Sequence, residues 1–447
     1  MEIFIKVVQL LLSLSILVLL HELGHFLFAR LFNTRVEKFY LFFNPWFSIF
    51  KFKRGDTTYG LGWLPLGGYV KISGMIDESM DKESMNQPPQ PWEFRSKPTW
   101  QRLLIMVGGV LVNLLLAFFI YWMILFTWGE TRLPNSSLTS GIWVTDSLAY
   151  DMGLRTGDKV LNINEREVSY YTDILPQMAF GGTMLIDRQG EELELELPVD
   201  IVGQLVERRL RGMPVAPRIP FIFAGFPDGS INEESDLEAG DRITRVGELD
   251  IEWFDQFEAA GNTYSDTTVE VEVLRNGETH SMMLHLDENG KFQVWPAMLS
   301  FSEMQRMELY EFKQIEYGLF AAFPAGVKKT IDQLTFYVRQ MGLIFKPETG
   351  AYKGLGGFGT IANLFPATWN WEAFWSMTAL LSLILAFMNI LPIPALDGGH
   401  VLFLMYEMVT GRKPGDKFME YAQVTGMILL FGLLIIANGN DIIRGCF

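Results

Sequence analysis

Cysteine and positive charge are the features that this sequence has least of. There is one cysteine, Cys446, among 447 residues, which excludes an internal disulfide and a cysteine-rich zinc site. The chain has 36 Lys and Arg residues against 52 Asp and Glu residues, a net charge of −16 at pH 7. Because nucleic-acid phosphates are bound by basic surfaces, we expect no nucleic-acid partner.

Apolar residues, in contrast, are abundant: they make up 49% of the chain, and the mean hydropathy is +0.17. About 20 apolar residues are enough to cross a bilayer. The segments that reach or approach this length lie at residues 7–29, 103–128, 374–396 and 421–437. The first has no clearly basic start and no small-residue cleavage site, so we interpret it as a retained span. The expected fold is therefore a membrane protein with four transmembrane helices.

The charges between the spans predict their orientation. Residues 30–102 contain 11 Lys and Arg and 7 Asp and Glu, a net charge of +4. Residues 129–330 contain 17 Lys and Arg and 35 Asp and Glu, a net charge of −18. Because loops on the cytoplasmic side are enriched in Lys and Arg, the first loop is expected in the cytoplasm and the acidic insertion outside.

The first apolar segment contains the pattern His21-Glu22-Leu23-Gly24-His25. Residues four apart share one face of a helix, so the two imidazoles can bind one metal ion while Glu22 flanks it. His21, Glu22 and His25 are the only ionisable residues between Val7 and Ala29. Titratable groups are costly inside a membrane and therefore indicate function. The pattern predicts a metal site within the bilayer.

A catalytic zinc ion commonly has three protein ligands and an open position for water. The candidate third ligand is Asp397, at the end of the third predicted span, in the stretch Asn389–His400. The first and third spans run in the same direction, so Asp397 can lie at the depth of the two histidines. We interpret the nearby His400 as a structural residue and not as a ligand.

Two further patterns lie near the predicted membrane surface. Residues 59–72 mix β-formers with glycines and predict a hairpin or curved sheet in a β-loop of about 50–75. It is either a plain surface hairpin or an edge strand that binds an extended substrate. The candidate contact residues are Gly67, Gly68, Tyr69, Val70, Lys71 and Ile72. In the second span, Gly109 and Asn113 share one face, which taken alone is typical of helix packing. Residues 77–98 are polar and are expected to form a linker.

The acidic insertion contains a repeat. Residues 152–164 and 236–246 each combine a short helix and turn, then Gly-Asp, then an alternating strand. The repeat looks like the PDZ pattern and predicts two inserted α+β domains, at 140–212 and 213–296. They either bind extended peptides or act as steric bulk. An amphipathic helical connector is expected at 297–366, between membrane domains at 1–139 and 367–447.

Together these features resemble the site-two proteases, which are intramembrane zinc metalloproteases. The motifs that carry the resemblance are His21-Glu22-Leu23-Gly24-His25 and Leu396-Asp397-Gly398-Gly399-His400. Four spans with paired PDZ-like units resemble the bacterial regulator-of-sigma-E protease branch in particular. The resemblance covers essentially the whole chain.

The resemblance implies one Zn²⁺ per chain, held by His21, His25 and Asp397, with Glu22 as the catalytic base. It implies that Asn389 contacts substrate or the developing oxyanion, and it places Asn113 among the substrate-binding candidates. The implied substrates are single-span membrane proteins such as an anti-sigma factor, or signal-peptide remnants, in the bacterial inner membrane. The external PDZ-like pair would then act as a size filter.

Two other functions compete with this interpretation. One is a membrane zinc protease whose third ligand is a Glu on a later span, but Glu407 and Glu420 flank the fourth predicted span and do not lie within it. The other is a non-catalytic scaffold that presents the PDZ-like units. A scaffold would not need His21, Glu22, His25 and Asp397 in apolar helices.

Overall fold

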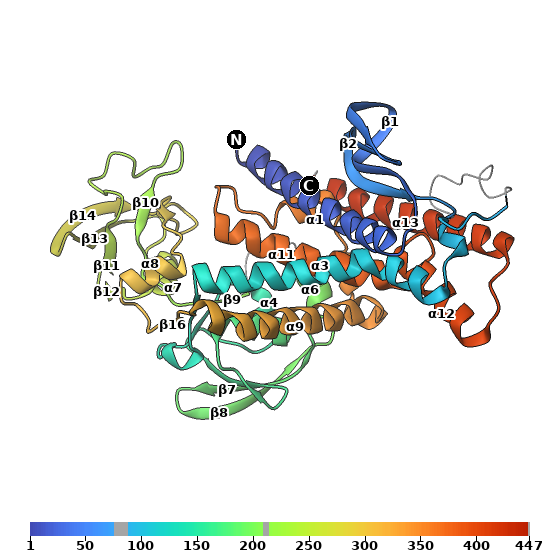
Figure 1. Cartoon of the computed structure of the whole chain (residues 1–447). Helices are drawn as coiled ribbons and strands as arrows, with labels where there is room; N and C mark the ends of the chain where they lie inside the picture. The colour runs from blue at the N-terminus through green and yellow to red at the C-terminus, as the bar shows by residue number, and fades with distance from the viewer. Residues whose placement is uncertain (76–87, 209–213, 446–447) are drawn as a thin grey trace. The chain divides into compact units, whose positions relative to one another are not determined.

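The computed structural model describes residues 1–75, 88–208 and 214–445, and the chain divides into two compact units. The helical unit contains Met1–Glu130, Glu316–Gly342 and Leu355–Phe447. The sheet unit contains Thr131–Ile315 and Leu343–Gly354. Residues 77–87 of the predicted linker and the predicted domain boundary at 212/213 lie outside the described residues. Figure 1 shows the helices and strands by label.

The helical unit contains the apolar helices that the sequence predicts. They are α1 (Glu2–Leu31), α3 (Thr99–Thr127), α11 (Trp371–Ile390) and α13 (Asp416–Gly445). Each is long and apolar enough to cross a membrane. An α-helix satisfies its own backbone hydrogen bonds, which is the requirement for a span in a medium without water. The prediction of four apolar helices of membrane-spanning length is confirmed.

Helices α1 and α3 approach each other closely because each has a glycine at the point of contact. A Cβ atom on Gly24 of α1 would lie 2.3 Å from the carbonyl oxygen of Gly108 on α3. Small residues allow the backbones of membrane helices to meet in this way. The contact lies one residue before His25, so α3 comes directly against the face that carries the predicted metal ligands.

The third apolar helix ends earlier than predicted. Helix α11 ends at Ile390, and a separate helix, α12, runs over Asp397–Thr410. The prediction that this span continues to residue 396 is therefore wrong. Pro392 and Pro394 lie in the intervening segment, and proline has no N–H to continue a helix. Ala395 adopts a positive φ of 79° just before the new helix. Asp397 is thus the first residue of α12, and α12 carries it independently of α11.

Residues 59–72 belong to a single strand, β2 (Thr57–Ile72), which pairs with β1 (Val36–Arg54). The predicted curved sheet is present, but the prediction of a hairpin within 59–72 is wrong, because the partner strand begins at Val36, before the predicted β-loop of about 50–75. The strands curve, so residues 38–41 of β1 are paired with 68–71 of β2 on one side and with 58–61 on the other. The later part of β1 pairs with 57–62. In the described part of the chain this sheet has no further strand. Residues 68–72 consequently form an open edge.

Two further helices belong to the helical unit. They are α9 (Leu319–Ile344) and α10 (Phe358–Ala362). Helix α9 runs through Pro324 without a break, although proline has no N–H to donate to the carbonyl four residues earlier. The Trp122 Nε1–H of α3 donates a 2.8 Å hydrogen bond to the carbonyl of Leu319. The predicted connector at 297–366 therefore includes a helix that packs along α3.

The sheet unit contains two sheets with the same strand order, as the sequence repeat suggests. The first has the order β6-β5-β7-β8 and the second β12-β11-β13-β14. The strands are β5 (Lys159–Ile163), β6 (Arg166–Glu167), β7 (Gly182–Arg188), β8 (Glu191–Leu197), β11 (Arg242–Val246), β12 (Leu249–Asp250), β13 (Thr268–Arg275) and β14 (Glu278–His285). Each sheet faces its own apolar core, which contains Ile163 and Ile186 in the first and Val246 and Val271 in the second.

An ion pair recurs at the same place in both sheets. Asp158 and Asp241 follow the glycine of each repeat and are almost fully buried, at 1% exposure. Arg188 binds Asp158, and Arg275 binds Asp241, with the closest atoms 2.7 Å apart. Burial alone would raise the pKa of the Asp241 carboxyl, but hydrogen bonds from Arg275 and from the Glu238 backbone hold it below its usual value. The duplication thus includes both the Asp of the Gly-Asp motif and the Arg that pairs with it.

Short elements connect and flank the two sheets. They are β3 (Glu130–Arg132), β4 (Ile142–Val144), α4 (Ser147–Asp151), α5 (Ile174–Met178), α6 (Ile201–Glu207), β9 (Val215–Pro217), β10 (Phe223–Gly225), α7 (Phe254–Thr263), β15 (Trp295–Pro296), α8 (Phe301–Arg306) and β16 (Lys313–Ile315). Strand β9 pairs with β4, and Val215 lies in the first core. Met304 and Tyr310 of the predicted connector lie in that core as well. The first core therefore includes residues from outside the predicted first domain at 140–212.

Candidate metal centre

The three predicted ligands meet in the helical unit. His21 and His25 lie one turn apart on α1, and Asp397 begins α12. The Asp397 Oδ2 atom lies 3.1 Å from His21 Nε2 and 3.3 Å from His25 Nε2. The two Nε2 atoms are 3.2 Å apart. The side chains are largely buried, at 12%, 6% and 17% exposure. These donor atoms form a compact triangle that opens into a cleft.

The triangle has the dimensions of a zinc site. Ligand bonds of about 2.0 Å at tetrahedral angles place donor atoms about 3.3 Å apart, close to the separations found here. Asp397 Oδ2 is buried and has no hydrogen-bond donor. A buried anionic oxygen without a donor is costly unless a cation or another partner satisfies it. The two imidazoles and the carboxylate therefore fit one Zn²⁺ ion and leave a fourth position open.

Helix α3 contacts the Nδ1 atom of both histidines, the ring nitrogen that does not face Asp397. His25 Nδ1 lies 2.8 Å from the carbonyl oxygen of Ile105. A carbonyl only accepts, so Nδ1 of His25 carries the proton and Nε2 is left free to bind metal. His21 Nδ1 lies 3.3 Å from the side-chain amide of Asn113. A Cβ atom on Gly109 would lie 2.5 Å from His25 Nε2, so only glycine lets α3 pack this close.

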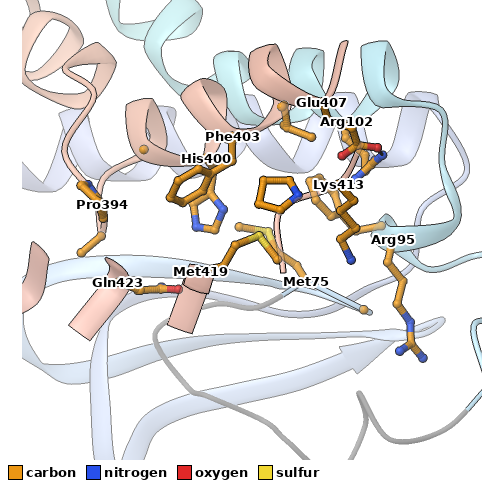
Figure 2. Close-up of a pocket in the computed structure, with 16 residues that line it drawn as sticks. Met75, Arg95, Arg102, Pro394, His400, Phe403, Glu407, Lys413, Met419 and Gln423 are labelled. Carbon is orange, nitrogen blue, oxygen red and sulfur yellow. Dashed lines mark hydrogen bonds and ion pairs between the residues drawn. The ribbon is translucent and has the colours of Figure 1, made fainter. Parts of the chain in front are cut away.

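Helix α12 is fixed at its far end as well. Arg102 of α3 forms a 2.5 Å ion pair with Glu407, and both side chains are mostly buried. Thr99 donates a further hydrogen bond of 3.1 Å to the same carboxylate. Figure 2 shows the Arg102 and Glu407 side chains together at one end of a pocket that also contains His400. The last turns of α12 are thus tied to α3, while its first residue is the candidate metal ligand.

The candidate base and the open strand edge face the same cleft. Glu22, His21, His25 and Asp397 line it together with Gly68, Tyr69, Val70, Lys71 and Ile72. The Val70 backbone N–H donates a hydrogen bond to the Glu22 carboxylate. Gly68 lies against α1, because a Cβ atom there would be 2.9 Å from Val18 Cγ1. The strand edge therefore runs directly beside the predicted metal position.

The remaining predicted site residues occupy different surroundings. The Asn389 amide nitrogen, on the last turn of α11, lies 3.5 Å from His21 Nε2. It is close enough to reach a group bound beside the metal position. Asn113 is fully buried against His21, and in the described residues neither it nor Gly67 lines the cleft. His400 lines the cleft but is not among the clustered donor atoms.

Some contacts around the site have no sequence signal of their own. The Ile105 carbonyl is a backbone group 80 residues away from His25, and Arg102 and Glu407 are 305 residues apart. An isolated Arg or Glu at a helix end is common, so neither residue marks the pair. Such partners are found only once the helices are packed.

The chain matches known proteins over nearly its full length. Residues 9–433 match peptidase family M50. The regulator of sigma E protease of Haemophilus influenzae is 27% identical over 467 aligned residues, which cover 97% of each chain. A protein of Rickettsia conorii is 26% identical over 98% of both chains, and one of Xylella fastidiosa is 29% identical over 96% of this chain and 97% of its own. The names of the last two include the words zinc metalloprotease.

The family assignment and the geometry agree on the type of chemistry. Two histidines one turn apart on an apolar helix and a distant aspartate are brought together around one position, and Glu22 lines the same cleft. The family match extends from α1, which carries the histidines, through α12, which carries the aspartate. This chain belongs to peptidase family M50 and is a zinc metalloprotease of the membrane.

Proposed function

We propose that this protease hydrolyses peptide bonds in or near the transmembrane segment of single-span membrane proteins. The observation that carries the proposal is the position of the metal centre: His21, His25 and Glu22 lie on a helix that is long and apolar enough to cross the bilayer. A soluble substrate would not need a site at this depth. We assign one Zn²⁺ per chain to His21, His25 and Asp397.

The residues around the centre divide the reaction between them. Zinc bound there would polarise the scissile carbonyl and lower the pKa of water towards neutrality. Glu22 accepts the proton of the attacking water at its carboxylate and later delivers it to the leaving amine. The Asn389 amide donates a hydrogen bond to the oxyanion that develops; a contact of this kind contributes about 3 kcal/mol.

The open edge of β2 provides a place for the substrate. A helical substrate hides its peptide bonds, so it must unwind before hydrolysis, and the exposed N–H and C=O groups need partners in an apolar setting. Residues 68–72 lie at the edge of the two-stranded sheet, in the lining of the cleft that also contains Glu22 and Asp397. We propose that the unwound segment adds to this edge as a further strand.

Cysteine crosslinking tests the strand assignment, and the chain is convenient because Cys446 is its only thiol. In a Glu22→Gln, Cys446→Ser background, Lys71→Cys is expected to form a disulfide with a cysteine next to the scissile bond of a trapped substrate. Lys51→Cys, on the far part of β1, is the matched control and should not crosslink. Equal crosslinking from both positions would contradict binding at the β2 edge.

The charge asymmetry supports an orientation and a setting. We infer that the acidic insertion forms two PDZ-like domains outside the bacterial inner membrane and that the metal centre opens towards the cytoplasm. Because one relative is named regulator of sigma E protease, we propose an anti-sigma factor as the substrate class. In the Cys446→Ser background, an impermeant thiol reagent should label Ser265→Cys in intact spheroplasts and Lys53→Cys only after lysis. The reverse pattern would invert the proposed topology.

Metal removal tests the function itself. The full chain, purified and reconstituted in lipid vesicles, is expected to cut a single-span model protein within or next to its span. A strong chelator should abolish the cleavage, and added Zn²⁺ should restore it. Cleavage that persists without metal, or a chain that binds zinc but cuts only soluble peptides, would refute the proposal. A chain that binds no zinc and cuts nothing would favour a membrane scaffold.

A further inference from the structure

Helix α3 supplies none of the three proposed metal ligands, yet it contacts both histidines and the far end of α12, the helix that carries Asp397. Its Ile105 carbonyl accepts from His25, its Asn113 side chain meets His21, and its Arg102 holds the far end of α12. We propose that α3 is the positioning helix of the metal centre and that Asn113 is the positioning residue for His21. This inference rests on the proposed ligand set.

The contacts of the Asn113 side-chain amide indicate which of its two polar atoms faces His21. Its Nδ2 lies 3.3 Å from His21 Nδ1, while its Oδ1 is buried without a hydrogen-bond partner. The residue is fully buried in an apolar helix, where an unsatisfied amide oxygen is costly. Rotation of the terminal amide by 180° exchanges the two atoms. It places Oδ1 against His21 Nδ1 as an acceptor, and the NH₂ group takes the former place of the oxygen.

The exchanged amide matches what metal binding requires of His21. An imidazole that binds metal through Nε2 carries its proton on Nδ1, and that N–H needs an acceptor. The Asn113 oxygen is an acceptor, whereas its NH₂ group is not. His21 then has the same arrangement as His25, whose Nδ1–H donates to the Ile105 carbonyl. Both rings would be held in one tautomer by groups on α3.

Neighbouring contacts hold the Asn113 backbone in place. The Ser382 hydroxyl of α11 donates a 2.7 Å hydrogen bond to the Asn113 carbonyl oxygen, and both residues are fully buried. Gly109, one turn earlier, gives the imidazoles room against α3. The Asn113 backbone is therefore held by α11, and the absence of a side chain at Gly109 allows α3 to lie close to the two histidines. Ser382 does not itself contact either histidine among the described hydrogen bonds.

Zinc affinity, measured by competition with a chromophoric chelator, tests the assignment. Asn113→Leu fills the same space without a polar atom and is expected to weaken zinc binding by about 10–100-fold, the usual effect of losing such a partner. Asn113→Asp keeps an acceptor and should bind zinc at least as tightly as wild type. Because its charge also attracts cations, the Co²⁺ absorption spectrum provides a second readout. Asn113→Asp should keep the wild-type band pattern, and Asn113→Leu should alter it.

Ser382→Ala is the matched control, because it removes a buried hydrogen bond at the same place without touching His21. It should lower the thermal midpoint of the metal-free protein and leave zinc affinity unchanged. Wild-type zinc affinity in Asn113→Leu would overturn the inference, as would equal losses in Asn113→Leu and Asn113→Asp. If Asn113→Leu does not fold, Asn113→Ala takes its place in the comparison. A wild type that binds no zinc would instead refute the ligand set.

Discussion

Glu22→Gln is expected to retain zinc and to lose cleavage of a single-span substrate by about 10²–10⁴-fold, the usual contribution of a general base. Glutamine has nearly the shape of glutamate, so the packing against Val70 and α1 is preserved. It cannot accept a proton from the attacking water, however. Zinc content by elemental analysis and turnover in lipid vesicles are the two measurements.

The control for this prediction is Glu37→Gln, which removes a carboxylate from β1 near the cleft. Glu37 pairs with Lys71 and is not among the residues that line the cleft in the described structure. It should change turnover only slightly. If Glu22→Gln cleaves at the wild-type rate, another group activates the water. If it loses zinc as well, Glu22 acts through the metal centre and not as the base.

Asp397→Ala is expected to lose both zinc and cleavage. The variant removes the buried oxygen that faces both Nε2 atoms and leaves two imidazoles to hold the ion alone. We expect a loss of zinc affinity greater than the 10–100-fold that is usual for a supporting residue. Chelator competition measures the affinity, and the vesicle assay measures turnover. The two values should fall together.

His400→Ala separates the two interpretations of the Asp397-to-His400 stretch. His400 lies one turn further along α12 and lines the same cleft, but the clustered donor atoms come from the other three residues. His400→Ala should therefore keep its zinc. A His400→Ala protein without zinc, together with an Asp397→Ala protein that retains it, would show that the third ligand is assigned to the wrong residue.

The local parts of the site could be predicted from the sequence because a helix fixes its own spacing. His21 and His25 had to share a face once α1 was helical, and the long apolar runs had to be helices in a bilayer. The β-structure of residues 59–72 and the repeated Gly-Asp motif could also be predicted, since turns and alternating strands leave local patterns. The partner strand at Val36–Arg54 was largely missed. Asp397 was predicted because the pair needed a third ligand.

The end of the third apolar helix could not be predicted correctly from the sequence. Apolar residues continue past Ile390 as far as Leu396, so hydropathy alone extends the helix to the aspartate. The prolines at 392 and 394 instead end α11 and allow α12 to start at Asp397. Hydropathy reports whether a segment favours lipid, and it does not report whether the backbone inside that segment is continuous.

By itself, then, the sequence determined the histidine pair, the candidate base, the apolar helices and the duplicated insertion, all of which follow from spacing within a single element. Only the tertiary structure decided that Asn113 faces His21, that the Ile105 carbonyl faces His25, and that β2 has an open edge beside Glu22. Those contacts join residues far apart in the chain. The two contacts to the histidines depend on the close packing of α1 against α3 at Gly24 and Gly108. The spacing of Gly109 and Asn113 indicated helix packing, but it did not identify the helix that α3 packs against.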